Sequence, residues 1–283
     1  MTRFRTAAPL VRAAVCAFAA AVLPCAADAA EPASEFNVVL TQRVWVATWD
    51  QALNDLQITG FDAATGRPTV RAAYQKNVSR RSIPISALGL RYGRWTGTVA
   101  RFGTQRFDGN DSYIEPYVRR DETDVSLGYQ VLPGLSLAII RKSGTVSLTQ
   151  TQAASELTGG DGPIKATGNL IGLSASAPLT DSLLVYGNMA YGPGKVADPQ
   201  GQFQSLKGRY TLAEFGLAYR HSFAQTTLGI QALSLQAGYR TQVLSYPGFV
   251  PSDFDALPVQ YTITSSKARS VTDGFVLSVS LIF

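Results

Sequence analysis

The last nine residues of the chain restrict most strongly how it can fold. Small polar residues, Ser278 and Ser280, alternate there with apolar ones. The apolar positions are Phe275, Leu277, Val279, Leu281 and Phe283. A period of two is the pattern of a strand with one apolar face. In a soluble protein such a terminal strand would usually fray, because no following chain covers its apolar face. We therefore expect something other than following chain to cover it.

This strand resembles the closing strand of Gram-negative outer-membrane β-barrels, whose terminal aromatic residue helps the assembly machinery to recognise the chain. The resemblance implies an assembly signal. Its residues are Phe275, Leu277, Val279, Leu281 and Phe283. It also implies a location in the cell outer membrane, reached through the periplasm, with periplasmic chaperones and the barrel assembly machinery as partners. It implies no particular activity.

The N-terminus indicates export independently. Three arginines precede an apolar run over residues 13–23, and a small-residue stretch follows at 26–30. This is the layout of a secretory signal peptide, and the A-x-A rule places cleavage after Ala29. We therefore expect a signal peptide over residues 1–29 and a single barrel domain over residues 30–283. Both cysteines lie in the predicted signal, so the mature chain would have no disulfide.

Composition favours a barrel over other membrane folds. Mean hydropathy is +0.05 with 16% charged residues, yet no mature segment has 18 consecutive apolar residues, which argues against membrane-spanning helices. With 25 glycines and 12 tyrosines, the composition suits strands that are apolar outside and polar inside. The net charge of +5 is too mild to indicate nucleic acid as a partner.

Turn signals and alternation divide the mature chain into ten strands. The clearest hairpin covers residues 123–140, with Pro133-Gly134 at its turn, and others cover 169–191 and 210–240. The stretch 85–102 is long enough for two strands with a turn near Gly93. If that stretch or one long loop is misread, the count becomes eight or twelve.

The predicted connections alternate in length, as in bacterial outer-membrane barrels. Short ones fall near residues 93, 133, 180 and 225. Long ones cover residues 50–82, 103–118, 144–166, 192–208 and 242–270. We therefore expect an all-β, closed, antiparallel transmembrane barrel with short periplasmic turns and long external loops.

Aromatic residues near the strand ends predict two interfacial rings. The external ring would contain Trp49, Phe102, Tyr117, Tyr191, Tyr210 and Tyr239. The periplasmic ring would contain Phe36, Tyr92, Trp95, Tyr129, Tyr219, Phe223 and Phe283. Tyr210 has the inward parity of its strand, so either a bulge or an inward tyrosine is required there.

Strand parity also predicts a polar cluster in the lumen. Its charged members would be Arg91, Asp124, Glu214 and Arg240. Opposite charges in so narrow a barrel should pair, because an unpaired buried charge is costly. The cluster then forms either a salt-bridged plug, which we favour, or a small gated polar pore.

Catalytic and metal-binding residues are not evident in the sequence. Omptin proteases also have ten strands, but the one histidine here, His221, falls beside a predicted periplasmic turn, away from external loops. Its position also argues against histidine-dependent phospholipase and lipid A deacylase barrels. The stretch Asp108-Gly-Asn-Asp111 is rich in oxygen ligands but lacks the spacing and closing glutamate of a calcium loop. We expect no cofactor and no metal.

One basic cluster falls at the predicted external interface. Lys76, Arg80 and Arg81 could contact the phosphates of lipopolysaccharide, or could simply be solvated. Outer-membrane lipid and lipopolysaccharide are therefore expected partners. The function we favour is a surface-exposed structural or interaction role for a barrel with a plugged, narrow lumen. A small-solute porin-like channel is the alternative, and an outer-membrane protease or lipase ranks third.

Overall fold

The computed structural model describes most of the expected barrel domain. The described residues are 36–52, 56–61, 68–73, 80–108, 114–150, 164–197, 205–223, 229–247, 262–263 and 267–283. The predicted signal peptide lies outside these ranges. Within them, no helix is long and apolar enough to cross a bilayer.

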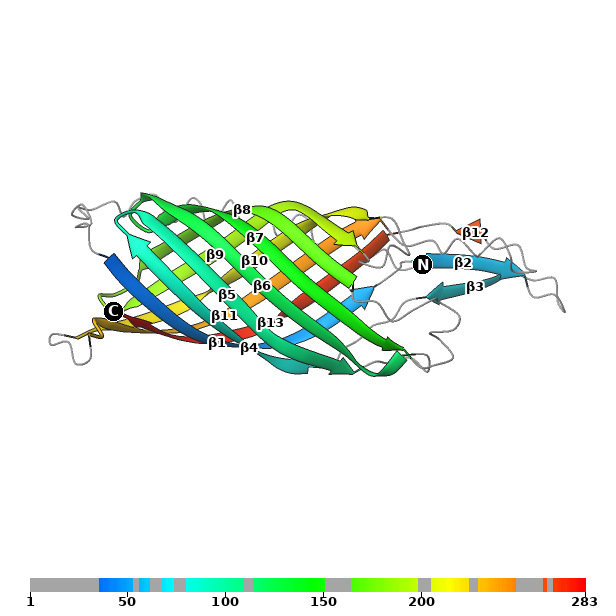
Figure 1. The fold of residues 1–283 in the computed structure, drawn as a ribbon, viewed down its shortest axis with the longest axis horizontal. Coiled ribbons are helices and arrows are strands. Elements are labelled where there is room, and N and C mark those ends of the chain that lie inside the picture. The colour runs from blue at the N-terminus through cyan, green and yellow to red at the C-terminus, as the bar shows by residue number, and fades with distance from the viewer. Residues whose placement is uncertain are drawn as a thin grey trace.

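Ten antiparallel strands close into one barrel (Figure 1). In chain order they are β1 (Phe36–Ala52), β4 (Arg80–Tyr92), β5 (Trp95–Asp108), β6 (Ile114–Leu132), β7 (Leu135–Gln150), β8 (Ile164–Pro178), β9 (Leu183–Ala197), β10 (Leu206–Ser222), β11 (Ala232–Pro247) and β13 (Lys267–Ile282). Each strand pairs with its chain neighbours in the barrel, and β13 pairs with β1. The predicted closed barrel and its ten strands are confirmed, and the counts of eight and twelve are excluded.

The terminal strand closes the ladder through its last residue. Phe283 N donates to Val38 O at 2.9 Å, and Val38 N donates to Phe283 O at 3.1 Å. Closure removes the exposed sheet edge, so the strands satisfy one another's backbone groups without water. This is one of only two backbone arrangements that can cross hydrocarbon.

Tight turns join the strands at one end of the barrel. The connections at 93–94, 133–134 and 179–182 mark this end, which we call the turn end; the opposite end is the loop end. Gly93 and Gly134 have φ angles of 54° and 72°, a left-handed backbone that glycine adopts most easily. The turn at Gly93 separates β4 from β5, so the stretch 85–102 does hold two strands, as expected.

Three further strands lie where the sequence predicted only loops. They are β2 (Leu56–Phe61), β3 (Pro68–Ala73) and β12 (Thr262–Ile263), and they form a separate sheet in the order β12-β2-β3. Figure 1 shows this sheet beyond the loop end. The first and last long connections therefore pair with each other. β12 has only two residues and β2 and β3 six each, so alternation is absent in the first and brief in the other two.

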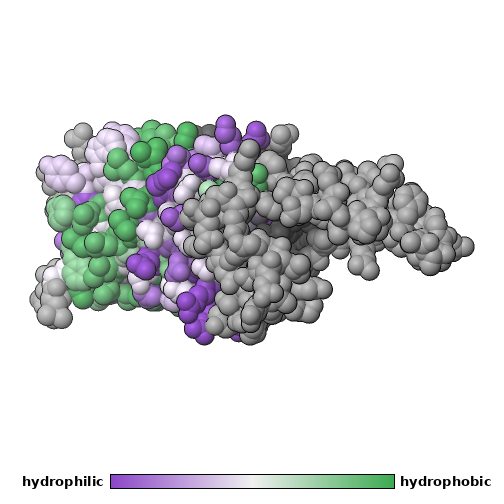
Figure 2. All heavy atoms as spheres, turned by 45° about the vertical axis from the view of Figure 1, so that its right-hand side comes forward, coloured by the Kyte–Doolittle hydropathy of each residue, from purple (hydrophilic) through white to green (hydrophobic). Residues whose placement is uncertain are grey.

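The outer wall of the barrel is apolar toward the turn end. Ile171, Phe275 and Ile139 expose 71%, 69% and 64% of their surface. Figure 2 shows apolar surface over the turn-end part and hydrophilic surface between it and the loop end. Monomeric soluble proteins rarely expose a continuous apolar surface of this extent. The wall is therefore built to face hydrocarbon.

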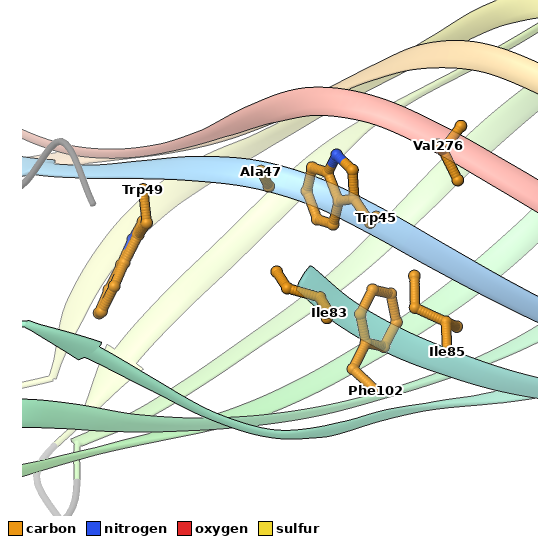
Figure 3. Close-up of a cluster of buried hydrophobic side chains, with 7 residues drawn as sticks. All are labelled: Trp45, Ala47, Trp49, Ile83, Ile85, Phe102 and Val276. Carbon is orange, nitrogen blue, oxygen red and sulfur yellow. The ribbon is translucent and has the colours of Figure 1, made fainter. Parts of the chain in front are cut away.

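The lumen holds two buried apolar clusters. Figure 3 shows the first, from β1, β4, β5 and β13, which consists of Trp45, Ala47, Trp49, Ile83, Ile85, Phe102 and Val276. The second, from β8 to β11, consists of Leu170, Ala190, Val196, Tyr210, Leu212 and Leu244. The interior therefore contains packed apolar side chains as well as polar ones, and it is less polar than expected.

This packing corrects the predicted external aromatic ring. Trp49, Phe102 and Tyr210 are buried in the lumen, because each shares the parity of inward-facing neighbours on its strand. Position along a strand was a poor guide there, because a residue near a strand end can face either the lumen or the lipid, and only its parity separates the two. The predicted periplasmic ring agrees better with the structure. Six of its members are exposed on the outer wall: Phe36, Tyr92, Trp95, Tyr129, Tyr219 and Phe223.

Candidate functional site

Charged side chains from β6 and β7 form one half of a network in the lumen. Glu122 and Asp124 lie two residues apart, so they share the inner face of β6. Asp124 is in register with Lys142 on β7. The Lys142 ammonium donates to both carboxylate oxygens of Asp124 at 2.7 Å and also pairs with Glu122. Arg120 adds a second cation, 2.7 Å from Glu122.

The other half comes from β10, β11 and β1. Glu214 is in register with Arg240, and Arg240 Nη1 lies 3.2 Å from Glu214 Oε2. Arg43 on β1 pairs with the other oxygen of the same carboxylate. The Tyr186 hydroxyl also donates to that oxygen, at 3.1 Å. Glu214 therefore binds two guanidinium groups and a phenol at once.

The two halves meet across the lumen. Arg240 Nη2 lies 3.9 Å from Asp124 Oδ2, and Gln242 Nε2 donates to Glu122 Oε2 at 3.1 Å. Both contacts join β11 to β6, which are five strands apart in a ring of ten and hence on opposite walls. Arg120 Nη1 also reaches Thr272 on β13, at 2.5 Å. Side chains from opposite walls thus touch, and they cross the lumen at this level.

We call this set the lumen network. Its charged members are Arg43, Arg120, Glu122, Asp124, Lys142, Glu214 and Arg240, with Tyr186 and Gln242 as neutral partners.

The lumen network is largely buried and lies beside the apolar clusters. The side chains of Lys142 and Glu214 are only 1% and 2% exposed. The Arg240 guanidinium lies over the rings of Trp45 and Phe102, with its carbon 5.2 Å and 5.6 Å from the two ring centroids. Buried charges of this kind are stable only when paired, and cation–π contacts add to that pairing. The arrangement favours a fixed plug over a hydrated pore lining.

Sequence parity located part of this network. Asp124, Glu214 and Arg240 belong to it, whereas Arg91 lies nearer the turn end and donates to Gln130 Oε1 at 3.0 Å. The prediction missed Lys142 and Glu122, because the expected strands ended at 140 and began at 123. Extending the same alternation by one step on each strand would have included both.

The structure also places the other residues that the sequence analysis singled out. His221 is exposed at the end of β10, its ring 5.0 Å from that of Phe223 in a T-shaped contact. In the described part of the chain, no three histidine, cysteine or acidic side chains are grouped to hold a metal ion. Of the stretch Asp108-Gly-Asn-Asp111, residues 109–111 lie outside the described residues.

The predicted lipid-contact residues divide between the two faces, whereas the assembly-signal residues share the outer face. Arg80 is exposed on the outer wall, but Arg81 has the inward parity of Ile83, and Lys76 lies outside the described residues. Phe275 and the other assembly-signal residues share the outward parity of β13. The exposed fractions are 69%, 58% and 46% for Phe275, Leu277 and Val279.

A closed strand ladder, an apolar outer wall and a charged interior together define the class. The protein is a transmembrane β-barrel of the kind found in Gram-negative outer membranes.

Comparisons with known proteins do not narrow this class to a family. No family model matches the chain, and no curated protein matches it. Among solved structures, the outer membrane protease OmpT from Escherichia coli is 10% identical with a TM-score of 0.38, covering 90% of this chain and 100% of that one. A Pseudomonas aeruginosa FadL homologue is 10% identical with a TM-score of 0.37, covering 88% and 90%. The toluene transporter TodX from Pseudomonas putida is 12% identical with a TM-score of 0.32, covering 88% and 90%. No activity follows from similarities this low.

Proposed function

We propose that this protein is an outer-membrane barrel with a closed lumen, which serves as a rigid anchor for surface-exposed loops. The observation that carries the proposal is the direct contact between opposite walls, from Arg240 to Asp124 and from Gln242 to Glu122. A conducting pore needs a continuous hydrated path past this level. Side chains that touch across the full width of the lumen obstruct that path.

The packing beside the lumen network supports a permanent closure. Trp45 and Phe102, which contact Arg240, belong to the first buried apolar cluster. The second cluster, which includes Tyr210, is formed by residues of β8 to β11. Opening the lumen would separate charges that are paired and buried, which is strongly unfavourable. A ten-stranded barrel has only slightly more interior space than an eight-stranded one, whose interior side chains fill it.

A closed barrel acts through what it presents outside. The proposal places the turn end in the periplasm and the loop end at the cell surface, after removal of residues 1–29. The longest connections leave the loop end, and two of them contribute to the sheet of β2, β3 and β12. The surface role is then structural or adhesive, with contacts made by these connections.

Single-channel conductance in planar bilayers tests the closed lumen. The wild-type protein should show no stable conductance steps. The double variant Glu214→Ala/Arg240→Ala should leak, because it removes contacts on which the crossing depends. A matched control is Arg91→Ala/Gln130→Ala, which deletes a lumen pair outside the network and should stay closed.

Two results would overturn the proposal. Stable, regular steps from the wild-type barrel would favour the small-solute channel instead. Unchanged leakage in the double variant, with the barrel still folded, would show that the lumen network does not close the lumen.

A further inference from the structure

The outer wall of the barrel carries an excess of basic side chains, whereas the lumen holds charges of both signs. The acidic members of the lumen network all point inward, whereas the strands carry ten exposed basic side chains on the outer wall wherever side chains are described. These ten are Arg80, Arg101, Arg106, Arg119, Arg141, Lys165, Lys195, Lys207, Arg209 and Arg269. Where side chains are described, two carboxylates face outward among them, and each already has a hydroxyl partner: Asp121 accepts from Thr104 and Asp273 from Thr48.

Two of the ten lie much closer to the turn end than the rest. Arg101 is six residues from Trp95, where β5 starts, and Arg141 is six residues from Leu135, where β7 starts. The other eight are at least eleven residues from the turn-end limit of their strands. With a strand rise of about 3.4 Å and a tilt of about 40°, six residues correspond to about 16 Å of barrel height. The apolar band of such barrels is about 25 Å tall.

The two arginines are neighbours on the outer wall. Only β6 separates their strands, and its residues Thr123 and Val125 are in register with Arg101 and Arg141. Arg141 Nη1 donates to Asn169 Oδ1 on β8 at 2.7 Å. No ion pair joins either guanidinium to a carboxylate in the described part of the chain.

The apolar wall is short beneath this pair. On β7 the outward apolar residues are Leu135, Leu137 and Ile139, and Arg141 follows directly. On β13 they continue from Phe275 to Phe283. A cation on the lipid face is costly near the bilayer centre and tolerated near the interface. The headgroup level must therefore come closer to the turn end over β5 to β8 than over β13.

We propose that Arg101 and Arg141, with Asn169 and the Thr123 hydroxyl, form a binding site for the phosphate groups of a phosphorylated glycolipid in the outer leaflet. Guanidinium groups offer paired donors that match phosphate oxygens, and a phosphate at this depth supplies the counter-charge that no carboxylate of the described residues gives the two arginines. The site is distinct from the sequence-predicted cluster of Arg80 and its neighbours at the loop end. It rests on the outer-membrane location proposed above.

Thermal unfolding with added lipid A tests this site. Full-length mature protein refolded in detergent would be titrated with diphosphoryl lipid A, with its dephosphorylated form, and with inorganic phosphate. The unfolding midpoint should rise with diphosphoryl lipid A only. In Arg101→Gln/Arg141→Gln the lipid concentration needed for half of that rise should increase at least tenfold. The midpoint without lipid should stay close to that of the wild type.

The matched control removes two other outward cations. Lys195 and Lys207 are in register on β9 and β10 near the loop end, and Lys195→Gln/Lys207→Gln should respond to lipid A within twofold of wild type. An equal loss in this control would indicate diffuse attraction and overturn the site. A midpoint that does not respond to lipid A, or that responds equally to the dephosphorylated form, would overturn it as well.

Refolding into phosphatidylcholine vesicles without lipid A distinguishes failure of the phosphate site from failure of the proposed membrane location. A chain that folds there but ignores lipid A refutes only the phosphate site. A chain that cannot insert at all refutes the location as well.

Discussion

At the scale of single residues, the face of the strand that a charged side chain occupies decides whether it is buried and paired. Glu214 illustrates this: it lies in the lumen with two guanidinium groups and the Tyr186 hydroxyl around it. A buried carboxylate with several donors is stable, but each of its partners then depends on it. Removing one member of such a group leaves a charge buried without compensation.

We therefore expect Glu214→Ala to lower the free energy of unfolding by about 3 kcal/mol or more, because it leaves Arg43 and Arg240 short of negative charge. Urea unfolding of the protein folded in lipid vesicles, followed by tryptophan fluorescence, measures the change. Asp181→Ala is the control, since this exposed turn carboxylate should contribute about 0.5 kcal/mol or less. Equal effects of the two substitutions would contradict the structural role of the lumen network.

At the scale of elements, the hairpins are defined by their turns. In the hairpin of β6 and β7, Gly134 has a φ of 72° and its carbonyl accepts from Ser176 N at 2.7 Å. A Cβ at this position would collide with the carbonyl oxygen of Ser176. The turn thus fixes both the hairpin register and its contact with β8.

Gly134→Ala should destabilise the barrel by about 1–2 kcal/mol, since it combines a left-handed backbone with this collision. The midpoint of urea unfolding in vesicles reports the loss. Gly97→Ala provides the matched control on β5, where a Cβ meets no atom within 4 Å and φ is not positive. A similar midpoint for both variants would argue against the turn geometry described here.

At the scale of the whole molecule, the barrel is apolar outside and tightly packed inside. The chain has three tryptophans, and they divide between these environments: Trp45 and Trp49 are buried in the lumen, whereas Trp95 is exposed on the outer wall near the turn end. Of the three tryptophans, only Trp95 should therefore contact the acyl chains.

Quenching by lipids with brominated acyl chains checks this arrangement. Trp95→Phe, which keeps the two lumen tryptophans, should lose little fluorescence in brominated vesicles, because short-range quenchers cannot enter the lumen. Trp45→Phe/Trp49→Phe, which keeps Trp95, should be strongly quenched. Strong quenching of the Trp95→Phe variant would mean that the lumen tryptophans face lipid, contrary to the described fold.

Local patterns in the sequence were sufficient to predict the barrel class, its ten strands and most of its turns. Alternation of side chains and glycine-bearing turns are properties of short segments, so they are readable without knowledge of distant contacts. The same parity placed Asp124, Glu214 and Arg240 inside. Trp49 on β1 was misplaced because it was assigned from its position at a strand end and not from its parity, which is inward.

Only the closed tertiary structure decided how the lumen is occupied. Gln242 and Glu122 are 120 residues apart in the chain, and they touch because closure of the ring places β11 opposite β6. The uneven height of the apolar wall, short at Arg141 and tall at Phe275, likewise emerges only when the strands lie side by side. Alternation tells each residue which side of the wall it faces, whereas the partner across the barrel depends on how every strand is tilted and staggered before the ring closes.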